Sequence, residues 1–103
     1  MSTDGNGVVG RSIHVVGVVS RSGPDAGVLG ESTQRQGVVG RGGSYGGEFA
    51  GPLASIRLTP QASTGRPTTG SHQMGELRCD ANGVLWFCTK TGFPGIWKRV
   101  TLT

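Results

Sequence analysis

The stretch Gly7-Val8-Val9-Gly10-Arg11-Ser12 recurs along the first half of the chain at intervals of ten residues. The further copies are Gly17-Val18-Val19-Ser20-Arg21-Ser22, Gly27-Val28-Leu29-Gly30-Glu31-Ser32 and Gly37-Val38-Val39-Gly40-Arg41-Gly42, with a divergent fifth copy at Gly47-Glu48-Phe49-Ala50-Gly51. A fixed period is typical of stacked repeat proteins, in which each unit buries its apolar side against its neighbours. The repeat therefore predicts a fibrous structural module over residues 7–51 rather than an enzyme.

The aliphatic pair in each repeat supplies two columns of side chains, because successive residues of a strand point to opposite faces. One column stays apolar through all five repeats, whereas the other ends in Glu48. We assign the first column to the core of a shaft, and its members are Val9, Val19, Leu29, Val39 and Phe49.

A ten-residue period favours three intertwined chains over one. Ten extended residues reach at most about 33 Å, and a single chain returning within that length would spend half of it on corners. Three chains that each contribute one side solve this and leave no open strand edges along the shaft. The chain also holds 20 glycines and only 34% hydrophobic residues, so a single chain has few apolar side chains with which to form its own core. Oligomerisation is therefore expected.

The rest of the chain divides by composition. Residues 1–6 predict a flexible leader. Residues 52–75 predict a connecting strand at 54–58 and an exposed loop at 59–70, rich in proline, serine and threonine. Residues 76–103 hold both tryptophans and predict a cap that ends the stack and nucleates assembly.

The predicted cap is a three-stranded β-meander. An Asn82-Gly83 step between two apolar runs indicates a hairpin, with Asp80 as a turn residue. A second turn at 91–95 leads into a third strand at 96–102. This hairpin places Cys79 opposite about Val84, which makes a bridge to Cys88 awkward, so two buried free thiols or a bridge between chains fit better. The predicted fold class is thus all-β: an intertwined trimeric β-helix or β-prism shaft with a C-terminal β-meander cap.

These phrases resemble the C-terminal region of bacterial and phage-associated repeat proteins. The Gly-Val-Val-Gly repeat is similar to the repeats of the triple-stranded β-helices in phage tail spikes and tail fibres. It is followed by Gly75-Glu76-Leu77, Asp80-Ala81-Asn82-Gly83, Leu85-Trp86-Phe87-Cys88-Thr89 and Gly92-Phe93-Pro94-Gly95-Ile96-Trp97. The period of ten departs from the shorter repeat of the best-known spike needle. The resemblance implies a homotrimer, a place on a virion tail or an extracellular surface appendage, and a structural or receptor-facing role.

Catalytic chemistry is weakly represented in the sequence. The chain has no Gly-x-Ser-x-Gly elbow, and its six acids are dispersed. We therefore expect a non-catalytic protein with no catalytic residue and no cofactor, and keep a hydrolase acting at a subunit interface as a third alternative. Three copies of His72 on a threefold axis could bind a metal ion, against the plainer interpretation of an exposed loop histidine.

The expected partners are copies of the same chain and, as an alternative function, a cell-surface glycan bound by a tip module. The candidate ligand contacts are Phe93, Arg66 and His72. The net charge of +4 is spread along the chain without interleaved aromatic residues, so no nucleic-acid partner is expected. No apolar run approaches the roughly 18–20 residues of a membrane span, so no membrane insertion is expected.

Overall fold

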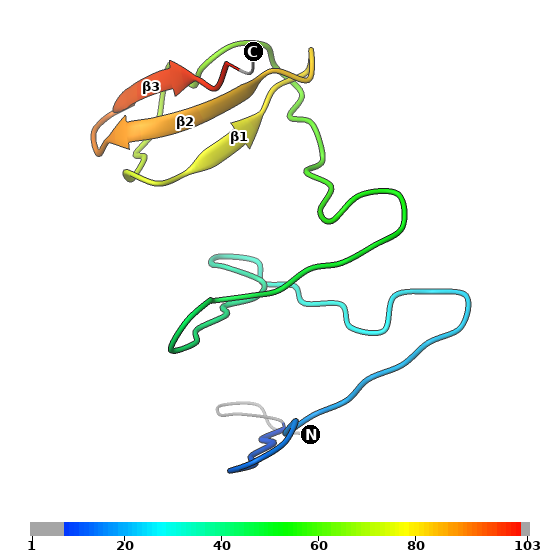
Figure 1. The fold of residues 1–103 in the computed structure, drawn as a ribbon. Coiled ribbons are helices and arrows are strands. Elements are labelled where there is room, and N and C mark those ends of the chain that lie inside the picture. Colours follow the sequence, from blue (N-terminus) through cyan, green and yellow to red (C-terminus); the bar gives the residue numbers. More distant parts are fainter. Residues whose placement is uncertain (1–7, 102–103) are drawn as a thin grey trace. The chain divides into compact units, whose positions relative to one another are not determined.

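The structure is a computed structural model that describes residues 8–101. The predicted leader at 1–6, together with Gly7 and residues 102–103, lies outside the described residues. The chain divides into two compact units, residues 1–47 and 48–103. The described residues form strands and no helix, which confirms the all-β prediction (Figure 1). Within the same residues there is accordingly no helix of the length and hydrophobicity that crossing a membrane requires.

The first unit is a series of loops that repeat with the sequence. At each repeat the backbone turns back on itself, so that Gly10 meets Gly17 and Gly30 meets Gly37, each pair seven residues apart. A Cβ at Gly37 would lie 2.5 Å from the carbonyl oxygen of Gly30, which leaves no room for a side chain. The loop between these two loops closes at Ser20 and Gly27, and the loop after them closes at Gly40 and Gly46. The repeated glycines are therefore closure points of successive loops.

A serine hydroxyl forms the same hydrogen bond within each of the first three loops. It accepts a hydrogen bond from the backbone N–H three residues later, a local turn that serine favours. The pairs are Ser12 with Val15 at 3.1 Å, Ser22 with Asp25 at 3.3 Å and Ser32 with Arg35 at 3.1 Å. The fourth repeat has Gly42 at this position. The sequence period is thus also a period of local structure.

None of the described residues of the first unit, 8–47, is buried in the single chain. Every residue from 8 to 64 is exposed, and the five residues of the predicted shaft core are 60–76% exposed. Residues 8–50 contain no assigned strand. The predicted strand at 54–58 is also not formed, because that segment has no paired neighbour in the described chain. The trimeric β-helical shaft therefore remains a prediction about the assembly.

The second unit contains an antiparallel sheet in the order β1-β2-β3 (Figure 1). Its strands are β1 (Leu77–Cys79), β2 (Leu85–Lys90) and β3 (Ile96–Arg99). The meander and both of its turns lie where the sequence predicts them. Gly83 has a φ of +78° and donates its N–H to the Asp80 carbonyl at 3.0 Å, so Ala81 and Asn82 are the central residues of the turn and Gly83 occupies the left-handed position that follows them. Cys79 faces Leu85 rather than Val84, because Asp80 pairs with Val84 instead.

One face of this sheet carries the core of the unit. The register places Trp86, Cys88 and Trp97 on that face, where Cys88 is 0% and Trp97 is 5% exposed. The opposite face, which carries Leu77 and Phe87 side by side, is open. Both cysteines are free thiols in the single chain; Cys88 is buried as expected, and Cys79 is half-buried.

The segment preceding the sheet is bound to it. The Gln61 N–H donates to the Cys79 carbonyl at 2.8 Å, and the Ala81 N–H donates to the Ser63 carbonyl at 2.9 Å. Pro67 is buried. The loop expected at 59–70 is therefore only partly an exposed loop, because β1 offers an edge of unpaired backbone groups that this segment satisfies.

Candidate functional site

A buried carboxylate, Asp80, ties the segment before β1 to the β1-β2 hairpin. One oxygen accepts the Gly65 N–H at 2.8 Å and the Trp86 indole N–H at 3.1 Å. The other accepts the N–H groups of Asn82 and Val84, both at 2.9 Å. Burial alone would raise the pKa of Asp80, but these four donors outweigh it and lower the pKa to about 2. The turn residue of the sequence prediction is thus an ionised structural centre.

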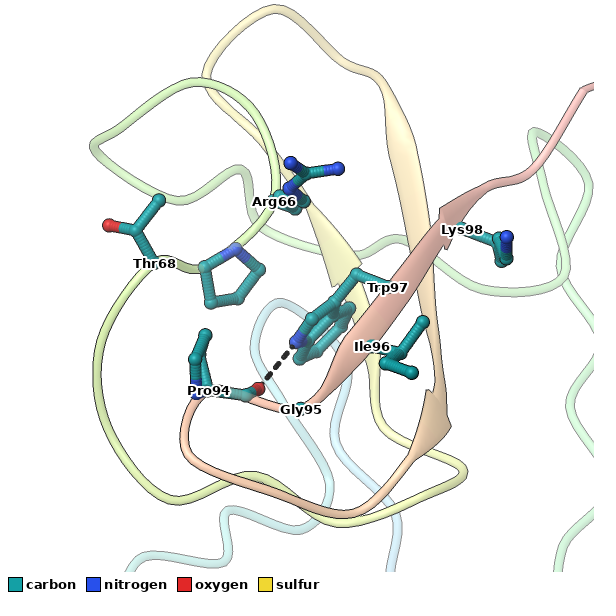
Figure 2. A pocket seen from close by; sticks show the side chains of 8 residues that line it. Arg66, Thr68, Pro94, Gly95, Ile96, Trp97 and Lys98 are labelled. Atoms are coloured by element: carbon teal, nitrogen blue, oxygen red, sulfur yellow. Dashed lines mark hydrogen bonds between the residues drawn. The ribbon is translucent and has the colours of Figure 1, made fainter.

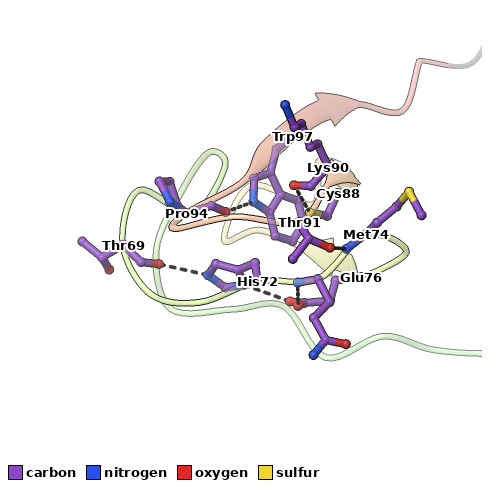
Figure 3. Close-up of polar contacts among 10 residues, drawn as sticks. Thr69, His72, Met74, Glu76, Cys88, Lys90, Thr91, Pro94 and Trp97 are labelled. Carbon is purple, nitrogen blue, oxygen red and sulfur yellow. Dashed lines mark hydrogen bonds and ion pairs between the residues drawn. The ribbon is translucent and has the colours of Figure 1, made fainter.

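Both ring nitrogens of His72 are engaged in hydrogen bonds (Figure 3). Nε2 donates to the Thr69 carbonyl and Nδ1 to the Glu76 carboxylate, each at 2.9 Å. The ring also meets Trp97 edge to face, with centroids 5.3 Å apart. The hydrogen bond with Glu76, followed by that with Thr69, raises the pKa of His72, so the imidazolium form is favoured.

In the single chain, the arrangement leaves His72 without a free ring nitrogen for a metal ion. A metal ligand needs a free imidazole lone pair, and both nitrogens already serve as donors. Within residues 8–101, no three His, Cys, Asp or Glu side chains gather to hold a metal ion. His72 is also half-buried rather than an exposed loop residue, because the backbone at 72 pairs with Gly92 through two hydrogen bonds of 3.0 Å.

Two shallow pockets flank the segment 66–68. The first, which we call the tryptophan pocket, has a volume of about 450 Å³ and lies against Trp97 and Pro94, whose carbonyl accepts the indole N–H at 3.0 Å (Figure 2). Because Trp97 is 5% exposed, it offers little ring surface to a ligand. We therefore assign the tryptophan chiefly to the core, as its sequence context predicted.

The second pocket, which we call the basic pocket, has a volume of about 310 Å³. Its lining combines three basic side chains with hydroxyl groups and contains no acid; the residues are Ser63, Thr64, Arg66, Pro67, Thr68, Thr69, His72 and Arg78. All are supplied by the segment 63–72 and by β1. The binding of that segment to β1 therefore creates the pocket.

Arg78 is a member of the basic pocket that sequence reasoning missed. One terminal nitrogen donates to the Ser63 hydroxyl at 2.6 Å, and its Nε–H is buried without a hydrogen-bond partner. The available signal was strand alternation, which puts Arg78 on the same face as Trp86, directly across from it.

The structure brings together two of the three predicted ligand contacts. Arg66 and His72 both line the basic pocket. Phe93 is exposed as predicted, at 79%, but it is not among the residues that line either pocket. Comparisons with protein-family models, with curated proteins and with solved structures find no match for this chain.

Proposed function

We propose that this chain is a non-catalytic structural module that self-associates as a homotrimer in a fibre or surface appendage, such as a phage tail fibre or tail spike. The observation that carries the proposal is the exposure of the aliphatic pair in each of the first four repeats. Contiguous apolar surface left open on a chain marks an interaction site. Because the apolar pairs recur with the repeat itself, a second copy of the chain offers a surface of the same period.

The exposed aliphatic pairs offer an appreciable part of the area that such an interface needs. The aliphatic pairs of the first four repeats comprise eight side chains, each between 60% and 86% exposed. A fully buried aliphatic side chain contributes about 1.5–3 kcal/mol at about 25 cal/mol per Å², which corresponds to roughly 60–120 Å² of apolar area. Eight side chains exposed to this extent therefore offer on the order of 500 Å² per chain. Standard interfaces bury about 800 Å² per partner, so the columns would supply a large share of one.

The open face of the second unit supports the same proposal. Leu77 and Phe87 are cross-strand neighbours and are 51% and 39% exposed. Ile96, two positions along β3 from Lys98 on the same face, is 48% exposed. A sheet covered on one side only is completed when copies pack their open faces together.

The native mass in solution tests the proposal. Light scattering on a sizing column should give three chains per particle, and a monomer at all accessible concentrations would refute self-association. Val39→Asp should abolish the assembly, whereas Arg35→Ala, a change within an exposed loop, should leave it intact.

A receptor-facing module that binds a cell-surface glycan is the second candidate function. The convergence of Arg66 and His72 on one pocket favours it. Retention of the chain on an immobilised acidic glycan, lost in Arg66→Gln with the native mass unchanged, would support this candidate, and retention equal to that on a neutral glycan would contradict it.

A further inference from the structure

The basic pocket carries positive charge that no carboxylate on its wall offsets. Among residues 8–101 the ion pair is His72 with Glu76, which leaves the guanidinium groups of Arg66 and Arg78 without a counter-charge. Glu76 contacts His72 but does not line this pocket. Glu76 and the ionised Asp80, which accepts the Gly65 N–H beside the lining, contribute two negative charges against the positive charges of Arg66, Arg78 and protonated His72, so the surroundings of the pocket stay net positive.

The basic groups are close enough to act on one ligand. All three basic groups line this one pocket, and the charge of Arg78 acts on His72, lowering its pKa against the hydrogen bonds that raise it. Like charges that face one pocket repel one another. An anion in the pocket would remove this repulsion and gain attraction from each basic group.

The donors in the pocket also point to an oxygen acceptor. Arg78 lines the pocket, and a terminal nitrogen of its guanidinium donates to the hydroxyl of Ser63, which is another lining residue, at 2.6 Å. Hydroxyl groups of Thr64, Thr68 and Thr69 add neutral donors around the lining. Planar guanidinium donors match the paired oxygens of carboxylates, sulfates and phosphates better than they match neutral groups.

We infer that the basic pocket binds an oxyanion group, a sulfate or carboxylate, carried by a single sugar residue of a surface glycan. The volume lies at the lower end of small-molecule pockets, which suits one sugar ring rather than an extended chain. The inference deepens the second function proposed above, because it names the chemistry that Arg66 and His72 would recognise.

Titration of the full chain followed by NMR of backbone amides tests the inference, at a pH below 6.5 so that His72 is protonated. The probes are glucose 6-sulfate, glucuronate, inorganic sulfate and glucose. We expect saturable shifts at residues 63–72 and 78 with the first three probes and none with glucose. Tighter binding of either sugar anion than of inorganic sulfate identifies a glycan as the source. Equal affinities keep the anion site but contradict the sugar component and the receptor function.

Paired variants separate a specific site from general charge attraction. Arg66→Gln should weaken binding about tenfold, the loss expected for one charge-assisted hydrogen bond. Arg57→Gln removes the same charge outside the pocket and should change the affinity less than twofold. Equal weakening by both variants, saturable binding of glucose, or shifts outside the pocket would overturn the inference. Arg78→Lys keeps the charge but removes the planar donors of the guanidinium, and should weaken binding while the chain stays folded by near-UV circular dichroism. Because native mass is measured separately, failure here leaves the trimer proposal unaffected.

Discussion

Two columns of side chains run along the repeats, and only one of them is assigned to the shaft core. Removing two methyl groups from a valine of one column or of the other tests this assignment. Val39 and Val38 are adjacent and similarly exposed in the single chain, at 62% and 71%. In a strand of the predicted shaft they would point to opposite faces, and only the Val39 column is assigned to the shaft core. Val39→Ala and Val38→Ala are therefore a matched pair with the same chemistry and different expected outcomes.

The size of the effect follows from the exposed area. Two methyl groups are worth about 1.6 kcal/mol when fully buried. Because 62% of Val39 is exposed in the single chain, assembly would bury about 1 kcal/mol of this contribution per chain, or about 3 kcal/mol per trimer. That change raises the trimer dissociation constant about 150-fold. The dissociation constant of a trimer has the units of a squared concentration, so the chain concentration at which half of the chains are assembled changes with its square root, roughly tenfold.

Sedimentation equilibrium over a wide concentration range measures that midpoint directly. We expect the midpoint to rise roughly tenfold for Val39→Ala and about threefold or less for Val38→Ala. Equal shifts would refute the assignment of the columns to core and half-covered face. A trimer whose midpoint is unchanged in both variants would refute burial of the repeats in the interface.

Three further predictions concern the second unit. Asp80→Asn should lower the melting temperature measured by near-UV circular dichroism, and an unchanged melting temperature would contradict the structural role of Asp80. Because folding lowers the pKa of Asp80 from 3.8 to about 2, the ionised carboxylate should stabilise the fold fully above pH 3.8. This stabilisation should be lost as the pH falls through 2. His72 has a raised pKa and Glu76 a lowered one, so their pair should stabilise fully between pH 4.5 and 6.5, with losses as the pH rises through the folded pKa of His72 or falls through that of Glu76. A melting profile that is identical in His72→Gln would refute this. Cys88 should react with a thiol reagent only on unfolding, and Cys79 should react earlier; equal rates in the folded chain would contradict the difference in burial.

Sequence reasoning located the elements whose signals are local. The Asn82-Gly83 step and the alternating strands around it define a hairpin with few alternatives, and the meander is found there. The ten-residue period likewise corresponds to a structural period. However, the period alone did not indicate that its glycines close loops seven residues long, because that contact depends on the path of the backbone between them.

The basic pocket could be foreseen only in part, because it depends on contacts between distant residues. Arg66 and His72 were candidates from their place in a polar segment. Nothing local to that segment showed that Asp80 would anchor it through Gly65, 15 residues earlier. Arg78 was overlooked because a charged residue in a short strand ordinarily faces solvent, whereas here the anchored segment covers it.

Each of the first three loops closes on the glycine that opens the following repeat, and this makes the number of repeats an adjustable quantity. The contacts run from Gly10 to Gly17, Ser20 to Gly27 and Gly30 to Gly37, and none of these pairs overlaps another. A repeat could therefore be duplicated or deleted without opening a neighbouring loop, and residues inside one loop could diverge without cost to the next. A chain built this way can be lengthened in uniform steps while the same terminal sheet and its pocket are retained.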